Sequence, residues 1–393
     1  MRTITRTVWI LSLVSLFTDT ASEMLYPIMP IYLKSIGFSV VLIGILEGFA
    51  EATAGLSKGY FGNRSDSSGK RVPFVQLGYS LSAISKPMMA IFIAPLWVFF
   101  ARTIDRLGKG IRTGARDAML SDEATPETKG KIFGFHRSMD TLGAVLGPLC
   151  ALIYLHFYPE NYKTLFLIAF VPGILAVLSA FLLKDKNVEV NAVKKNVSFF
   201  SFLSYWKHSP VEYRKLVIGL LLFTLFNSSD VFLLLRIKQS GLDDSSVIAV
   251  YIFYNLIYAI CSYPLGVLAD KIGLKSIFII GLVAYGIVYF GMGYSEDKIV
   301  YYLLFFLYGI YAAATEGISK AWISNISERK DTATAIGMYT GFQSICTMLA
   351  SSMAGFIWFK FGVSATFYVT GSVTLFVIIY FTFFVSKIQN SKH

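Results

Sequence analysis

The chain has 393 residues, of which 55% are hydrophobic and only 15% are charged. A soluble domain carries about a quarter charged residues, so this composition excludes an ordinary soluble protein and indicates an integral membrane protein. The net charge of +11 does not indicate a nucleic-acid-binding protein, because the cations lie inside apolar stretches or in the short loops between them.

Apolar stretches recur along the whole chain, each near the roughly 20 residues that a helix needs to cross a bilayer. We expect about twelve transmembrane helices, at residues 8–33, 39–61, 72–93, 95–118, 131–156, 163–184, 216–237, 246–268, 274–294, 299–325, 333–358 and 364–386. The basic residues concentrate in the loops after the even-numbered stretches. By the positive-inside rule, this pattern places both termini in the cytoplasm.

The sequence predicts two similar halves. A polar, lysine-rich segment, residues 185–215, separates the first six stretches, in residues 1–184, from the last six, in residues 216–393. The sequence around Gly59 matches the sequence around Gly266, 207 residues later. We therefore predict an all-α membrane protein of two six-helix halves that are joined by a cytoplasmic linker.

The stretch at residues 99–122 carries charged residues at steps of three or four, which is the spacing of one helix face. These residues are Arg102, Asp105, Arg106, Lys109, Arg112 and Arg116. Because a cationic face in hydrocarbon is costly, we expect it to line a polar pathway through the protein. Internal salt bridges are the alternative explanation.

Further charged residues lie inside other predicted spans, and several are four residues apart, so that they share a helix face. They are Asp19 and Glu23, with Tyr26 nearby, in the first span, Glu47 and Glu51 in the second, Asp230 in the seventh, and Glu316 and Lys320 in the tenth. The cost of inserting such groups favours a role in transport, with ion pairing inside the protein as the alternative.

Nothing in the sequence points to catalysis. It contains no nucleophile–base grouping, no metal-ligand spacing among the three cysteines, and no nucleotide-binding motif. We expect no enzymatic activity, no metal and no cofactor. Transport would then be driven by an ion gradient or by the gradient of the substrate itself.

Several short motifs resemble those of the major facilitator superfamily, and the resemblance covers essentially the whole chain. They are a loop motif, Gly266-xxx-Asp270-Lys271-x-Gly273, a fourth-span arginine motif, Arg106-xx-Lys109-Gly110, and the fifth-span motif of proton-driven exporters, Gly143-xxx-Gly147-Pro148. The resemblance implies the twelve-helix fold of this superfamily, with the first, fourth, seventh and tenth spans around a central cavity. More narrowly, the chain resembles a bacterial subfamily of permeases, which implies a multi-pass protein of the bacterial cytoplasmic membrane.

The loop motif has a first-half copy, which we interpret as Gly59-xxx-Asn63-Arg64, with Asn63 in the place of the usual aspartate and a turn that is two residues longer. By resemblance, this motif stabilises one conformation during alternating access. We expect conformational gating to involve Gly59, Asn63, Arg64, Gly143, Gly147, Pro148, Gly266, Asp270 and Lys271. For the glycines and the proline of the fifth span, helix packing and bending are the alternative.

Together these features predict a secondary active transporter that moves a small polar, anionic organic substrate with protons by alternating access. The expected substrate-binding residues are Tyr26, Arg102, Arg106, Lys109, Asp230, Glu316 and Lys320. The expected proton-coupling residues are Asp19, Glu23, Glu47 and Glu51. We expect a monomer whose partners are the substrate, protons and the lipid bilayer, and which binds no nucleic acid. The alternatives are a proton-driven drug efflux pump and, in another class, a non-transporting membrane sensor or receptor.

Overall fold

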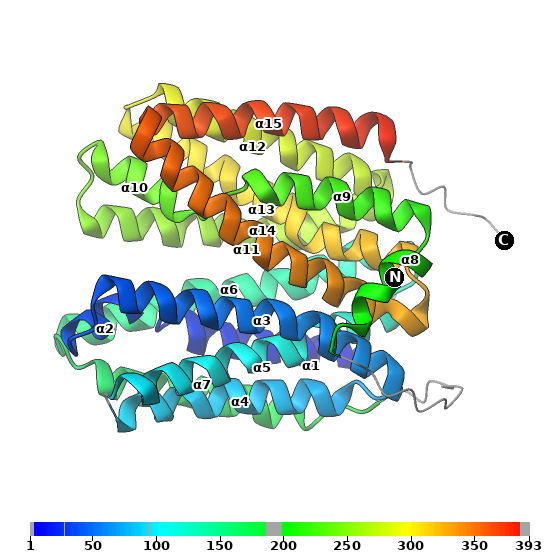
Figure 1. Cartoon of the computed structure of the whole chain (residues 1–393), viewed down its shortest axis with the longest axis horizontal. Coiled ribbons are helices and arrows are strands. Elements are labelled where there is room, and N and C mark those ends of the chain that lie inside the picture. Colours follow the sequence, from blue (N-terminus) through cyan, green and yellow to red (C-terminus); the bar gives the residue numbers. More distant parts are fainter. Residues whose placement is uncertain (1–3, 27, 93, 186–198, 386–393) are drawn as a thin grey trace. The chain divides into compact units, whose positions relative to one another are not determined.

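The computed structural model describes residues 4–26, 28–92, 94–185 and 199–385. Within these ranges the regular elements are all helices (Figure 1). They are α1 (Arg6–Glu23), α2 (Met29–Ser35), α3 (Val40–Ser68), α4 (Val72–Ile91), α5 (Pro95–Asp122), α6 (Lys129–Phe157), α7 (Tyr162–Ala180), η1 (Ser201–Ser204), α8 (Tyr205–His208), α9 (Val211–Phe226), α10 (Val231–Gln239), α11 (Asp244–Ile272), α12 (Leu274–Tyr294), α13 (Lys298–Ile326), η2 (Arg329–Asp331), α14 (Thr332–Phe361) and α15 (Val363–Phe384). The prediction of an all-α protein is confirmed.

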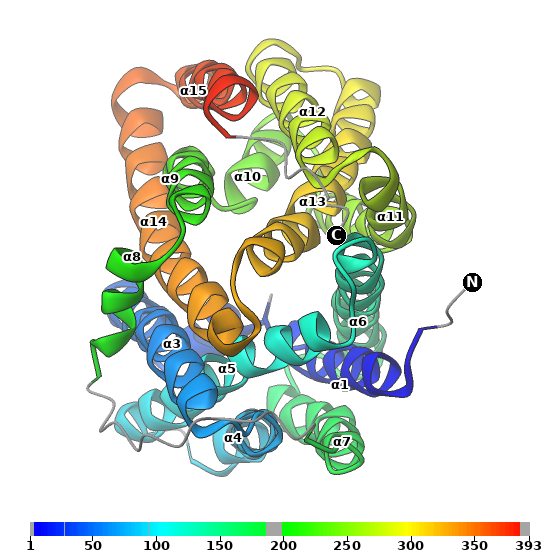
Figure 2. The ribbon, with the colours of Figure 1, turned by 90° about the vertical axis from the view of Figure 1, so that its right-hand side faces the viewer.

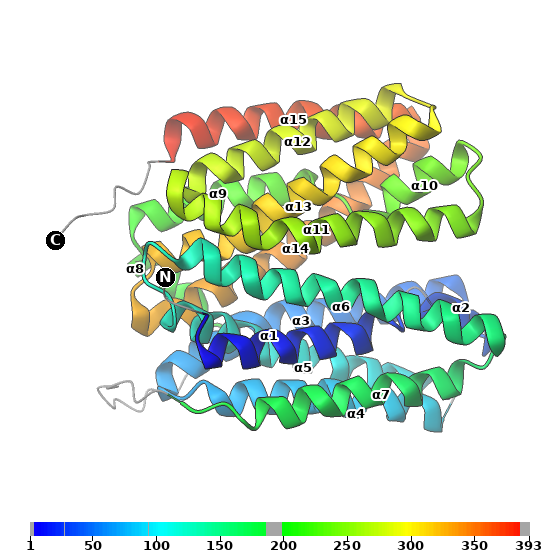
Figure 3. The same cartoon turned by 180° about the vertical axis from the view of Figure 1, so that it is seen from behind.

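Two of the predicted spans are each formed by two helices in succession. The first span contains α1 and α2, and the seventh contains α9 and α10 (Figure 3). The break in the seventh span comprises residues 227–230, Asn-Ser-Ser-Asp. Side chains of these types compete for the hydrogen bonds of a helix, which favours a break here. The Asn227 N–H still donates to the carbonyls of Phe223 (3.0 Å) and Thr224 (3.1 Å), which closes α9.

Eight segments of the described chain are long and apolar enough to cross a membrane by length and composition alone, and the first of them is α6. The helices α1, α3, α4 and α5 fall outside this set. They carry most of the charged residues that the sequence places inside spans. Such helices can cross a bilayer only where their charged faces meet protein or water.

The described chain divides into two compact units. Unit 1 comprises residues 1–123, 139–208 and 328–344, and unit 2 comprises residues 124–138, 209–327 and 345–393. The helices α6 and α14 therefore contribute residues to both units. The division into halves joined by residues 185–215 follows the sequence repeat and stays a prediction.

In unit 1, α5 packs against both α3 and α4, and α7 packs against α1 and α4 (Figure 2). The backbones of α4 and α5 approach closely at Gly78 and Gly108. A Cβ atom on Gly78 would lie 2.6 Å from the Gly108 carbonyl oxygen, and one on Gly108 would lie 2.5 Å from the Gly78 carbonyl oxygen. Because only glycine permits this approach, these two residues hold the charged face of α5 against α4.

In unit 2, α13 packs against α11 and α12, and α15 packs against α12 and α9. The interior of this unit is rich in aromatic hydroxyl groups. The Tyr285 and Tyr289 rings stack with their centroids 4.2 Å apart, and the Tyr311 ring lies 4.6 Å from that of Tyr285. Each of these tyrosines is less than 5% exposed.

Candidate functional site

Arg102 and Asp105 of α5 belong to a buried ion-pair network in unit 1. Lys86 Nζ of α4 lies 2.7 Å from Asp105 Oδ1, and Arg102 Nη1 lies 3.5 Å from Asp105 Oδ2. The Ser85 hydroxyl also donates to Asp105, at 3.3 Å. None of the three charged side chains is more than 8% exposed. Arg102 therefore has an acidic partner within the protein, and its expected role in substrate binding stays a prediction.

Farther along α5, two more arginines of the charged face have partners within unit 1. Arg112 Nη1 donates to Ser82 Oγ at 2.7 Å, and its guanidinium carbon lies 4.5 Å from the centroid of the Tyr79 ring. Arg116 Nε lies 2.8 Å from Asp117 Oδ1. The Arg112 contacts join α5 to α4, whereas the contact between Arg116 and Asp117 lies within α5.

The middle of α5 forms a different arrangement with α3. Arg106 Nη1 lies 3.8 Å from Glu51 Oε2. Lys58 and Lys109 also lie within electrostatic reach of the Glu51 carboxylate. Lys58 Nζ donates to Ser344 Oγ at 2.8 Å. We call Lys58, Arg106, Lys109 and Glu51 the basic cluster, in which three cations surround one acid.

The basic cluster is open, unlike the network around Asp105. The Glu51 side chain is 42% exposed, against 13% for Arg106, and Lys109 is exposed as well. Lys58 is buried, so the accessible positive charge is that of Lys109 and, in part, Arg106. Positive charge at this depth in a membrane protein suits an anionic ligand. Sequence reasoning did not single out Lys58, although its distance of seven residues from Glu51 places both on one helix face.

The acids of α1 lie close to the basic cluster. Asp19 is within electrostatic reach of Glu23, of Asp140 on α6 and of Lys109, and it shares a hydrogen bond with Asp140. Two carboxyl groups this close together are a suitable place for a proton to bind. Asp140 was not among the expected proton-coupling residues. Glu47, which was, lies outside the residues whose side chains the structure describes.

The glycines of the fifth-span motif bring α6 against the acid-bearing part of α1. A Cβ atom on Gly143 would lie 2.4 Å from the Leu16 carbonyl oxygen, and one on Gly147 would lie 2.6 Å from the Met24 backbone nitrogen. Pro148 lies within α6, directly after Gly147. Close helix packing is thus one function of both glycines, and their part in gating stays a prediction.

The remaining expected substrate-binding residues lie in three places. Tyr26 is 46% exposed and follows α1 in unit 1. In unit 2, Glu316 Oε2 of α13 lies 3.1 Å from Arg137 Nη2, and Lys320 lies one turn farther along α13. Asp230 lies in the break between α9 and α10, where the Tyr254 hydroxyl donates to its carboxylate.

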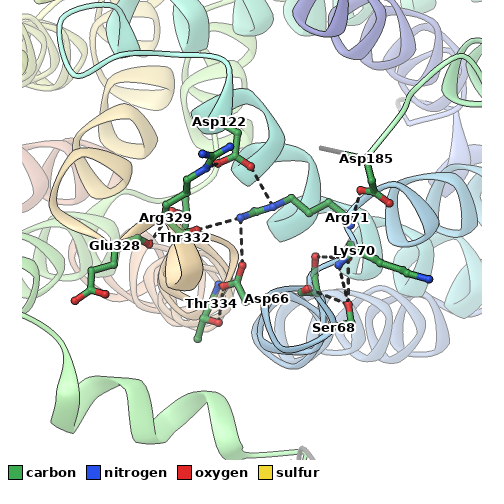
Figure 4. A network of polar contacts seen from close by, with 11 residues as sticks. Asp66, Ser68, Lys70, Arg71, Asp122, Asp185, Glu328, Arg329, Thr332 and Thr334 are labelled. Carbon is green, nitrogen blue, oxygen red and sulfur yellow. Dashed lines mark hydrogen bonds and ion pairs between the residues drawn. The ribbon is translucent and has the colours of Figure 1, made fainter. Parts of the chain in front are cut away.

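A second polar network joins five segments of unit 1 (Figure 4). Arg71, at the start of α4, lies 3.2 Å from Asp122 at the end of α5 and 3.6 Å from Asp66 near the end of α3. Its Nη2 also donates to the Arg329 carbonyl at 3.1 Å. Asp185 accepts from the Arg71 N–H at 2.9 Å. The network therefore connects the ends of α3, α4 and α5 to the residues that precede α14.

The structure changes the interpretation of the first-half loop. The residue that contacts the start of α14 is Asp66, which accepts from the Thr334 N–H at 2.7 Å. Four residues earlier, a Cβ atom on Gly62 would lie 2.4 Å from the Ala333 carbonyl oxygen. The motif is therefore Gly62-xxx-Asp66-xx-Gly69-Lys70-Arg71. Its aspartate is present, and its turn has the same length as that of the second-half copy. The alignment that placed Asn63 at the aspartate position was wrong by one helical turn.

Unit 2 repeats this arrangement. Asp270, near the end of α11, accepts from the N–H groups of Gly130 and Lys131 at the start of α6, both at 2.7 Å. A Cβ atom on Gly266 would lie 2.2 Å from the Gly130 carbonyl oxygen. Gly266 and Asp270 therefore correspond to Gly62 and Asp66.

The other residues expected in gating lie beside these contacts. A Cβ atom on Gly59 would lie 2.6 Å from the Phe202 ring of η1. Asn63 Oδ1 accepts from the Ser201 hydroxyl at 3.2 Å. Arg64 and Lys271 are exposed. None of these four makes the helix-end contact that Asp66 and Asp270 make.

The sequence profile of the Major Facilitator Superfamily matches residues 11–254 and 237–393 of the chain. An uncharacterized MFS-type transporter of Methanocaldococcus jannaschii is 35% identical over 363 residues, which cover 91% of this chain and 89% of that protein. A multi-drug resistance efflux pump PmrA homolog of Lactococcus lactis is 22% identical over 389 residues, which cover 92% of this chain and 90% of that one.

Among solved structures, the human organic anion transporter MFSD10 superposes with a TM-score of 0.84. The superposition covers 97% of this chain and 100% of the human one, at 16% sequence identity. At that identity the likeness concerns the fold alone. It bears out the twelve-helix architecture that the motifs implied.

Proposed function

The chain belongs to the major facilitator superfamily and is a multi-pass membrane transporter, and from this premise we propose that it carries a small organic anion together with protons. The observation that supports an anion is the basic cluster of unit 1. Three cations there lie around Glu51, and among them Lys109 is exposed, Arg106 is 13% exposed and Lys58 is buried. A carboxylate substrate matches the planar fork of Arg106 and can take the place of Glu51 beside it.

Lys109 suggests how anion binding and proton binding favour one another. This ammonium group lies within electrostatic reach of Glu51 on one side and Asp19 on the other. An anion that binds beside Lys109 offsets its positive charge and weakens its hold on the Asp19 carboxylate. Asp19, which shares a hydrogen bond with Asp140, then takes up a proton more readily. Proton release would in turn weaken anion binding, as thermodynamic linkage requires.

A drug efflux pump is the second candidate function. It is favoured by the likeness to the Lactococcus lactis efflux pump homologue and by the glycines of α6 that pack against the acidic helix α1. Lipophilic cations would be the substrates of such a pump. The two candidates therefore differ in the charge of the compounds that they bind.

A melting screen on the purified protein tests the proposal. We expect small di- and tricarboxylates to raise the melting temperature, because a ligand that binds only the folded state stabilises it. Lipophilic cations should not bind to the basic cluster. The best anion is then tested for flux into proteoliposomes, with and without a pH gradient. Stabilisation by cations alone favours efflux, and anion binding without flux favours a sensor.

A further inference from the structure

The break in the seventh span places an acid inside unit 2. Asp230 follows α9 and precedes α10, within a segment, Val211–Gln239, that is long and apolar enough to cross a membrane. The Tyr254 hydroxyl donates to its Oδ2 atom. Among the described residues, no Lys or Arg forms an ion pair with this carboxylate. A carboxylate at such a position is costly unless a positive group accompanies it.

Two aromatic rings, those of Tyr254 and Tyr308, lie near this acid, and the Tyr251 ring packs against Tyr254. The Tyr254 ring lies edge-on to Tyr251, at 5.4 Å between centroids, and edge-on to Tyr308, at 5.3 Å. Tyr254 and Tyr308 both lie within electrostatic reach of Asp230. Rings that meet edge to face present their faces in different directions, which is how aromatic cages surround a cation. We call Asp230, Tyr251, Tyr254 and Tyr308 the tyrosine cage.

Two further tyrosines, beside the cage, form hydrogen bonds to the break. Asn227 Nδ2 donates to the Tyr311 hydroxyl at 2.8 Å, and the Tyr285 hydroxyl donates to Asn227 Oδ1 at 3.0 Å. The Tyr311 ring in turn lies 5.3 Å from the Tyr308 ring. The interrupted backbone is thus fixed to α12 and α13. Irregular backbone at membrane depth is tolerated where it is buried in protein or lines a ligand site.

We propose that the tyrosine cage binds an organic ammonium group. The Asp230 carboxylate supplies the counter-charge, and the ring faces supply cation–π contacts that a simple proton site would not need. Asp230 and Tyr251 are partly exposed, whereas Tyr254 and Tyr308 are 5% and 6% exposed, so a ligand would reach the cage on the side of Asp230 and Tyr251. The inference goes beyond the proposed anion site, since it concerns a separate group of residues and a ligand of opposite charge.

Calorimetric titration of the purified full-length protein tests the cage, in a buffer without organic amines. Choline and tetraethylammonium are the probes, and 3,3-dimethylbutan-1-ol is the uncharged counterpart of choline. We expect saturable binding of both cations. The alcohol should bind more weakly than choline by at least about tenfold. Absence of saturable cation binding, or equal binding of choline and the alcohol, would overturn the proposal.

Matched variants assign the binding to the cage. Tyr251→Leu should weaken choline binding about tenfold, whereas Tyr251→Phe, which keeps the ring, should stay within about threefold. Asp230→Asn should abolish it, and Glu296→Gln, an exposed acid of the same unit, should leave it unchanged. If Asp230→Asn fails to fold, the Tyr251 pair decides, and equal affinities for Leu and Phe would contradict the cage. Arg106→Ala changes the basic cluster and should leave choline binding intact. Choline binding therefore tests the cage independently of the anion site.

Discussion

Asp66 accepts two hydrogen bonds from Thr334, from its N–H at 2.7 Å and from its hydroxyl at 2.8 Å. The contact ties the end of α3 to the first turn of α14. An acid at this place satisfies an N–H that has no partner within the helix, and it meets the positive end of the helix dipole. Asp270 does the same for α6 in unit 2. We therefore expect each acid to stabilise one arrangement of the two helices that it joins.

The first prediction concerns these two acids. Asp66→Asn and Asp270→Asn should each slow transport and leave equilibrium substrate binding within a few-fold of the wild type. The amide keeps an acceptor for the N–H group but loses the charge that the helix dipole favours, an effect of about 0.3–1 kcal/mol. Uptake into proteoliposomes gives the rate, and calorimetry gives the affinity.

Asn63→Ala is the matched control for Asp66→Asn, because Asn63 lies on the same helix and contacts only the Ser201 hydroxyl among the contacts described above. It should leave the transport rate nearly unchanged. A large loss of affinity with an intact exchange rate in the aspartate variants would show that these acids act in binding.

The second prediction separates the buried network of α5 from its open cluster. Asp105→Asn leaves Lys86 and Arg102 buried without their acid, which typically costs about 3–5 kcal/mol of stability. Glu51→Gln removes an acid that is 42% exposed and should change stability by less than about 1 kcal/mol. Thermal melting in detergent measures both. Equal melting temperatures for the two variants would refute the distinction.

The third prediction concerns protons. Asp19→Asn and Glu23→Gln should flatten the pH dependence of uptake, because neither replacement can bind and release a proton in this range. Asp140→Asn should do the same through the hydrogen bond that it shares with Asp19. Glu47→Gln and Glu51→Gln are tested beside them. Wild-type pH profiles in all five variants would place the coupling elsewhere, or exclude protons.

Apolar length and charge periodicity were enough to predict the all-helical membrane fold, since both depend on local sequence. The register of the first-half loop was not predictable in this way. Gly59 and Gly62 are almost one helical turn apart, so both suit a close helix approach, and only the partner at Thr334 shows which one precedes the aspartate.

Ion pairs were also only partly predictable. The spacing of Arg102 and Asp105 by three residues allows their contact on one helix, but Lys86 comes from another helix and its approach depends on Gly78 and Gly108. The tyrosine cage likewise gathers residues from the broken seventh span, α11 and α13. Such groupings arise from tertiary packing, which a local pattern does not specify.

If the basic cluster binds an organic anion, Arg106 should be the residue that contacts it. The most direct measurement is the affinity of the best anion from the melting screen for Arg106→Ala and Arg106→Lys. The Arg106→Ala variant loses a charge-assisted contact, so its affinity for the anion should fall about 10–100-fold, or roughly 1.5–3 kcal/mol. Arg106→Lys keeps the charge but not the planar fork, so it should also bind appreciably worse while its melting temperature stays nearly unchanged. Wild-type affinity in both variants would contradict the assignment of Arg106 as a substrate ligand.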